Sequence, residues 1–249
     1  MTEWNAVLVL LGSLLCAALL AAGIWVATPA RPSPEARQAL VPGAGMAVRL
    51  QPRIAFLPAQ AHKTGLILYP GVRVDPRVYS EVARAIADHG YLTLILPMRL
   101  NLALLSIGSA SAAMRDYSHI QRWVLAGHSL GGVAAAHFAL NNPSRRVAGL
   151  ALWAAAPLWK DDLSGATFPV ISIYASEDGL VSPKTILRAR HRLPQDTLYV
   201  EIVGGNHAQF GRYPPQPGSR PATISPTEQH AQVVRATLSL LSSVDRAAP

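Results

Sequence analysis

The sequence has few residues that carry charge and almost none that form disulfides. Cys16 is the only cysteine, so the chain can form no internal disulfide. A single cysteine does not identify the redox compartment of the protein. There is no P-loop and no cysteine or histidine pattern with zinc-ligand spacing, and Gly204-Gly205 is too short for a dinucleotide fingerprint. We therefore predict that the protein uses no metal ion and no cofactor.

Acidic residues are also scarce relative to basic ones, and the formal net charge at pH 7 is +8. An excess of this size can indicate a nucleic-acid partner or an anionic surface. The basic residues, however, are mostly arginines scattered along the chain, and the one cluster would not share a single helix face: Arg188, Arg190, His191 and Arg192. We therefore predict no nucleic-acid partner.

Charge is absent altogether from Ala6 to Ala27, a run long enough for a hydrocarbon core that needs about 20 apolar residues. A cleaved signal usually begins with a positive charge, whereas Glu3 is the only charged side chain before this run. We predict that residues 1–27 form a transmembrane helix and a single-pass membrane anchor, with a cleaved signal as the alternative. Arg31 and Arg37 follow the run, so the positive-inside rule favours the cytoplasmic side for the remaining chain.

The most informative segment is Gly127-His128-Ser129-Leu130-Gly131, which fits the G-x-S-x-G pattern. In this pattern the serine lies at a sharp turn from a strand into a helix, where its hydroxyl acts as a nucleophile. Residues 123–126 before it are apolar, as in a buried parallel strand, and residues 132–140 after it are small and apolar, as in a helix. We therefore predict Ser129 to be a nucleophile. The alternative is a serine that only caps the helix.

A serine hydroxyl needs a general base within hydrogen-bond reach and a carboxylate that orients this base. In α/β sheets that carry the motif, the order along the chain is serine, acid, histidine. Asp178 lies in the turn after the β-rich run 168–174, and His207 follows the next such run, 197–203. Both residues follow strand ends, where open α/β sheets bind ligands. We predict that Asp178 and His207 complete a triad with Ser129.

Other acids and histidines compete with this pair. Glu177 adjoins Asp178, and Asp161 and Asp162 follow the preceding strand, but an aspartate before a glycine at a turn is the better match. We expect Glu177 to face solvent. The remaining histidines lie in the serine motif, in the helix behind it, or in segments predicted as loops or helices: His62, His89, His119, His128, His137, His191 and His230.

A tetrahedral intermediate also requires backbone N–H donors for its oxyanion. One comes from the residue after the nucleophile, here Leu130. The second comes from the loop after an earlier strand, predicted at 66–69, and the Val72 amide is the candidate. The alternative is that Pro70-Gly71 forms only a turn.

Several motifs together resemble the α/β-hydrolases, and within them the group called α/β-hydrolase fold-5. They are Tyr69-Pro70-Gly71 with Val74-Asp75-Pro76, Gly127 to Gly132, Asp178-Gly179 and Gly204 to Gly211. The resemblance runs from about Gly65 to the C-terminal helix. It implies an α/β-hydrolase fold, a triad of Ser129, Asp178 and His207, and hydrolysis of an acyl compound, usually an ester. Val72 departs from the second glycine expected after Gly71.

The order of the other predicted elements fits a doubly wound, mostly parallel sheet. We predict strands within 46–57, 91–96 and 147–153, and helices at 76–89, 110–117 and 226–244. Residues 28–44 would form a proline-rich linker, and residues 45–249 one hydrolase domain. The segment from Pro157 to Thr167, where these hydrolases often insert a lid, is short. The site is therefore expected to be open, with Trp159, Phe210 and Tyr213 as candidate wall residues.

We predict a membrane-tethered serine hydrolase, a carboxylesterase acting on a small acyl substrate through an acyl-enzyme intermediate. A peptidase or an acyltransferase with the same triad is the first alternative. An inactive hydrolase fold that serves as a binding module is the second.

Overall fold

The computed structural model describes residues 3–142 and 146–247. Its centre is an eight-stranded sheet with the strand order β1-β2-β4-β3-β5-β6-β7-β8. Strand β2 is antiparallel to both of its neighbours, and the other pairs are parallel. The prediction of a mostly parallel α/β sheet is confirmed. The strands are β1 (Met46–Arg49), β2 (Ile54–Pro58), β3 (Thr64–Tyr69), β4 (Leu92–Ile95), β5 (Arg122–His128), β6 (Val147–Trp153), β7 (Val170–Ala175) and β8 (Leu198–Ile202).

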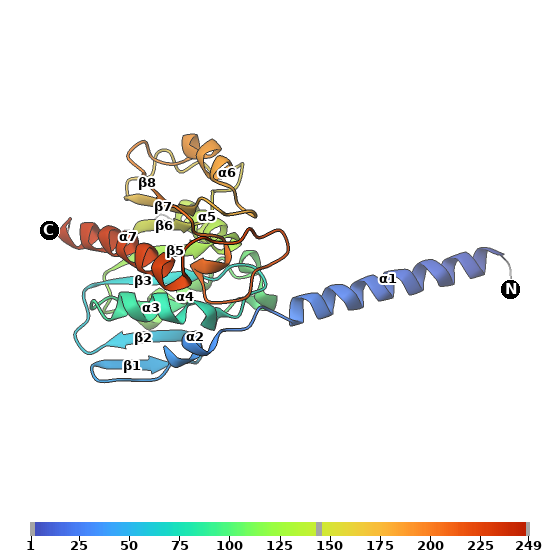
Figure 1. The fold of residues 1–249 in the computed structure, drawn as a ribbon, viewed down its shortest axis with the longest axis horizontal. Coiled ribbons are helices and arrows are strands. Elements are labelled where there is room, and N and C mark those ends of the chain that lie inside the picture. Colours follow the sequence, from blue (N-terminus) through green and yellow to red (C-terminus); the bar gives the residue numbers. More distant parts are fainter. Residues whose placement is uncertain (1–2, 143–145, 248–249) are drawn as a thin grey trace.

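Helices cover both faces of this sheet (Figure 1). α3 (Ser80–Ala87) and α7 (Pro226–Arg246) pack on one face, and α4 (Ser109–Asp116) and α5 (Leu130–Asn141) pack on the other. Alternate residues of β3 belong to different apolar layers: Leu66 and Leu68 pack with α3 and α7, whereas Ile67 and Tyr69 pack with α4 and α5. All residues of β3 are buried, which explains why its sequence is apolar after Thr64.

The apolar N-terminal run folds as α1 (Glu3–Ala27), which projects from the rest of the chain (Figure 1). Within residues 3–142 and 146–247, no helix is both long and apolar enough to cross a membrane. The predicted transmembrane helix is therefore wrong, and so is the predicted membrane localisation. The prediction rested on the absence of charge from Ala6 to Ala27. Absence of charge is a weaker condition than the continuous apolar length that a bilayer requires.

Part of the proline-rich segment predicted as a linker is ordered and packed. It contains α2 (Pro34–Gln38), which begins where the Ser33 hydroxyl accepts a hydrogen bond from the Ala36 N–H. The Arg84 guanidinium of α3 donates to the carbonyl oxygens of Ala39 and Val41. These bonds attach the segment to the outer side of α3.

The connections at the carboxyl end of the sheet differ in length: Ser129 alone joins β5 to α5, whereas residues 203–225 join β8 to α7. The predicted helix from Pro76 to His89 is divided into a 3₁₀ turn, η1 (Pro76–Tyr79), and α3. The segment Pro157–Thr167 contains no helix or strand, so no helical lid is inserted there. α6 (Pro183–Arg188), which the sequence analysis did not predict, begins at the Ser182 cap.

Candidate active site

Strained backbone marks one end of the sheet. Within residues 3–142 and 146–247, every non-glycine residue with positive φ follows the carboxyl end of β3, β4, β5 or β6: Arg73, Leu100, Asn101, Ser129 and Ala154. Such conformations cost about 1–3 kcal/mol each and tend to gather at functional sites. The carboxyl end of these strands is therefore the candidate site.

Ser129 forms the turn between β5 and α5. Its φ of 54° and ψ of −125° are far from helical values, and its N–H donates to the Trp153 carbonyl oxygen over 2.9 Å. Within the described residues, the Ser129 hydroxyl makes no hydrogen bond and does not cap α5. The turn thus presents a half-buried hydroxyl that the helix does not use, which argues against the capping alternative.

The glycines of the motif allow this turn to lie against the neighbouring backbone. A Cβ at Gly127 would collide with the Gly131 carbonyl group, and a Cβ at Gly131 would collide with the carbonyl oxygens of Tyr69 and Pro70. A Cβ at Gly132 would lie 2.7 Å from the Gly127 oxygen. Only glycine can therefore bring β5, α5 and the turn after β3 together.

Asp178 and His207 meet at the same edge. Asp178 Oδ2 lies 2.7 Å from His207 Nδ1, and both side chains are buried. The other carboxylate oxygen of Asp178 accepts hydrogen bonds from the N–H groups of Leu180 (2.8 Å) and Val181 (2.7 Å). The carboxylate is therefore fixed by three bonds, and it in turn fixes the ring of His207 with Nε2 away from Asp178.

The competing acids have other partners. Glu177 is half-buried and accepts from the Ser176 hydroxyl over 3.1 Å. Asp161 pairs with His137 at 2.9 Å, and Asp162 accepts from the Ser164 N–H. These contacts leave Asp178 as the acid that bonds to His207.

Three other histidines also lie beside an acid: His62 beside Asp245, His137 beside Asp161, and His230 beside Glu81. His207 differs in its place. Its ring centroid lies 4.4 Å from that of His128, the residue that precedes Ser129. Asp178, His207 and the serine turn therefore occupy one region.

The loop that carries His207 is held by a glutamine that the sequence analysis missed. Gln229 of α7 is fully buried; its Oε1 accepts from the Asn206 N–H and its Nε2 donates to the Asn206 carbonyl, both over 2.9 Å. Gly204, with a φ of 79°, and Gly205 bring the loop close to Thr223 and Gln229. A polar residue on the inner face of an amphipathic helix was the signal in the sequence.

Two backbone N–H groups near Ser129 are available as donors. Those of Leu130 and Val72 have no hydrogen-bond partner in the described part of the chain, whereas the Gly71 N–H donates to the Tyr79 hydroxyl over 3.0 Å. Of the two amides at the turn after β3, the Val72 amide is therefore the free one. An oxyanion site requires N–H donors that are free in this sense.

Tyr79 is a second residue that the sequence analysis missed. Its hydroxyl lies 2.8 Å from His128 Nδ1, and burial raises the pKa of this hydroxyl, so it keeps its proton. Burial, followed by the nearby His207, lowers the pKa of His128 well below its usual value. His128 is therefore a neutral ring that accepts the Tyr79 proton at Nδ1.

The candidate wall residues differ in exposure. Phe210 is buried and stacks on His128 with centroids 5.3 Å apart, and Tyr213 is also buried, so both belong to the packing beneath the site. Trp159 is 86% exposed. Its ring therefore projects into solvent from the short loop after β6.

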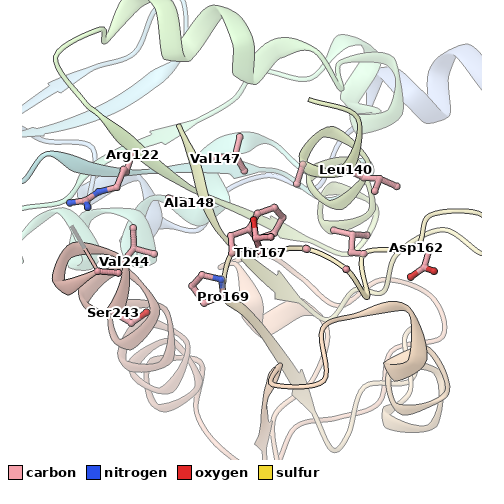
Figure 2. Close-up of a pocket in the computed structure, with 15 residues that line it drawn as sticks. Arg122, Leu140, Val147, Ala148, Asp162, Thr167, Pro169, Ser243 and Val244 are labelled. Carbon is pink, nitrogen blue, oxygen red and sulfur yellow. The ribbon is translucent and has the colours of Figure 1, made fainter. Parts of the chain in front are cut away.

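A cavity of about 840 Å³ lies at the other end of the sheet (Figure 2). Its lining includes Arg122 and Val147, which begin β5 and β6, together with Pro169 and Val244. β5 spans seven residues, so its two ends lie about 20 Å apart. This cavity is therefore remote from Ser129 and cannot hold a substrate for it. In the described residues, no group of three or more acidic, histidine or cysteine side chains is placed to hold a metal ion.

Comparison with known proteins gives one family. The sequence model of the alpha/beta hydrolase family matches residues 65–231. No match to this chain is found among curated protein sequences.

Solved structures give the same fold at low identity. A thermophilic esterase from Thermogutta terrifontis is 13% identical with a TM-score of 0.58, covering 80% of this chain and 98% of its own. Alpha/beta hydrolase domain-containing protein 10 from mouse is 14% identical with a TM-score of 0.56, covering 82% and 99%. An alpha-beta serine hydrolase homologue from Coxiella burnetii is 16% identical with a TM-score of 0.53, covering 78% and 98%.

Proposed function

Because this chain belongs to the alpha/beta hydrolase family, we propose that it is a serine hydrolase that cleaves carboxylic esters through an acyl-enzyme intermediate. The observation that carries the proposal is the buried Asp178–His207 pair beside the strained turn at Ser129. The family membership, confirmed here, was the expectation drawn from the sequence motifs.

In the proposed reaction, the Ser129 oxygen attacks the ester carbonyl carbon while His207 Nε2 takes the hydroxyl proton. The N–H groups of Leu130 and Val72 donate to the oxyanion that forms. His207 then returns the proton to the leaving alcohol, and the acyl group stays on Ser129. Water attacks this acyl-enzyme in a second step with the same residues, and the acid is released.

The Asp178 carboxylate has the role of an orienting group. Its bond to Nδ1 holds the proton on that nitrogen and leaves Nε2 free to accept one. The two N–H groups that bind its other oxygen keep the carboxylate in place when the imidazolium forms. The proposed substrate is a small ester, because the loop Pro157–Thr167 adds no helix over the site.

Labelling with a fluorophosphonate probe tests the proposal. The full-length protein should be labelled covalently and should hydrolyse an activated short-chain ester, whereas Ser129→Ala should lose labelling and lower turnover by orders of magnitude. The control is Ser239→Ala, which removes a hydroxyl from an exposed residue of α7 that donates only to the Ala236 carbonyl oxygen. Labelling that persists in Ser129→Ala would contradict the assignment.

A further inference from the structure

We propose that Tyr79 and His128 form a buried positioning pair that aligns the oxyanion donor at Val72 with the general base His207. The pair makes no contact with the substrate in this proposal. It rests on the proposed esterase function, since it concerns the geometry of the same site.

The Tyr79 hydroxyl links two loops that are far apart in sequence. It accepts from the Gly71 N–H over 3.0 Å and lies 2.8 Å from His128 Nδ1. A hydroxyl that accepts from an amide still has one proton to donate, and His128 Nδ1 is the acceptor within reach. The chain of bonds Gly71–Tyr79–His128 therefore connects the turn that carries Val72 with the residue that precedes Ser129.

His128 in turn contacts the general base. Its ring lies 4.4 Å from the ring of His207, and Phe210 stacks at 5.3 Å. His128 Nδ1 accepts the hydrogen bond from the Tyr79 hydroxyl. The single proton of the neutral His128 ring must therefore be on Nε2. The ring is thus held in one orientation and one tautomer, and it supports one face of His207.

The polar ring of His128 is not explained by packing alone. Its Nε2 is buried and has no hydrogen-bond partner in the described residues. A buried donor without a partner is destabilising, so an apolar side chain would be the simpler filler beneath His207. What an apolar side chain could not do is accept the Tyr79 proton and hold the turn at Gly71.

The space at Gly71 shows how closely the two parts are fitted. A Cβ at this position would lie 3.1 Å from both His128 Nδ1 and the Tyr79 hydroxyl. Displacement of either side chain would therefore change the position of the Gly71–Val72 peptide. Catalysis is sensitive to shifts of this kind, since a misplacement of about 1 Å can lower the rate about a hundredfold.

The test uses Tyr79→Phe, which removes one oxygen and keeps the ring. For a short-chain p-nitrophenyl ester, kcat should fall about tenfold or more while KM changes less than about twofold, because alignment affects the transition state and not ground-state binding. The affinity of an alkyl trifluoromethyl ketone, which forms an oxyanion on the serine, should fall by the same factor as kcat/KM. The matched control is Tyr91→Phe, which removes a hydroxyl from the residue just before β4, beside Asp245 at the other end of the sheet. It should leave kcat unchanged.

Two variants at His128 test whether a hydrogen-bond acceptor at this position preserves kcat. His128→Asn places an oxygen near the position of Nδ1 and should keep more of kcat than His128→Leu, which has no acceptor. Thermal unfolding of each variant shows whether it is folded at the assay temperature. A Tyr79→Phe protein with the kcat and ketone affinity of Tyr91→Phe would overturn the inference. A wild-type protein with neither labelling nor turnover would overturn the proposed function instead.

Discussion

Substitution of Gly131 by alanine should move the start of α5 away from the turn after β3 in the candidate active site. The added Cβ would lie 2.7 Å from the carbonyl carbon of Pro70, and closer still to the carbonyl oxygens of Tyr69 and Pro70. Carbon atoms in contact keep a separation of about 3.5–4.0 Å. Because all of these atoms belong to the backbone, no side chain can rotate to make room. The start of α5 and the turn after β3 must therefore move apart by about 1 Å.

This movement changes the distance between the proposed nucleophile and one oxyanion donor. Ser129 and Leu130 belong to the side of α5, and Val72 belongs to the turn after β3. A shift of about 1 Å between them should lower kcat/KM for a short-chain ester by about a hundredfold. Overpacking of this kind should also cost about 1–3 kcal/mol of unfolding free energy. The corresponding fall in Tm for a chain of this size is about 2–12 °C.

The assay compares Gly131→Ala with Gly165→Ala in the full-length protein. A Cβ at Gly165 would meet no atom within 4 Å, so this control adds the same methyl group without a collision. Steady-state ester turnover gives kcat/KM, the rate of fluorophosphonate labelling reports the nucleophile, and a thermal melt reports stability. If Gly131→Ala keeps kcat/KM within about threefold of Gly165→Ala, the argument from backbone contact is refuted.

Three further predictions follow from the same structure. Asp178→Asn should lower kcat by orders of magnitude and Glu177→Gln should leave it nearly unchanged, because only Asp178 bonds to His207; kinetics with the reverse order would identify Glu177 as the acid. Burial raises the pKa of Glu81, but hydrogen bonds from His230 and Arg212 outweigh it and lower this pKa from 4.5 to about 2. The carboxylate therefore stabilises the fold above pH 4.5, and this contribution, about 1–2 kcal/mol after solvent screening, should be lost as the pH falls toward 2. Denaturant titrations at pH 6 and pH 3 should show a smaller difference for Glu81→Gln than for wild type, and an equal difference would exclude this role. Each buried methylene is worth about 0.8 kcal/mol, and a site without a helical lid buries few of them, so short acyl esters should be hydrolysed at least as well as long ones. Specificity constants that rise steadily with chain length would contradict this expectation.

The local sequence was sufficient for the central elements of the fold. Strands such as β3 and β6 are buried on both faces, so they appear as short, continuously apolar runs between turns. The turn at Ser129 was identifiable because each of its glycines is required by a backbone contact, and such requirements restrict the residue type strongly. Ser129, Asp178 and His207 follow β5, β7 and β8, which are parallel, so their carboxyl ends lie on the same side of the sheet.

The N-terminal segment shows where sequence was insufficient. The run from Ala6 to Ala27 predicted a membrane span because it lacks charge, and no helix in the described ranges meets the requirements for one. The segment after it contains prolines and was predicted as a linker. α2 nevertheless packs there, because Arg84, more than forty residues away, binds the carbonyl groups that follow it.

The tertiary structure alone decided which polar residues support the candidate site. Tyr79 lies on a helical segment whose pattern indicates only packing, and the position of Gln229 on the inner face of α7 indicates a buried polar group without identifying its partner. Each bonds to a loop that is distant in sequence. Hydrogen bonds of this kind leave no periodic signal, because they join one side chain to one backbone group across the fold. The sequence by itself determined which residues could form strands, the serine turn and the acid–histidine order. Only the folded chain determined which buried polar groups pair, since that depends on distances between segments that no local pattern contains.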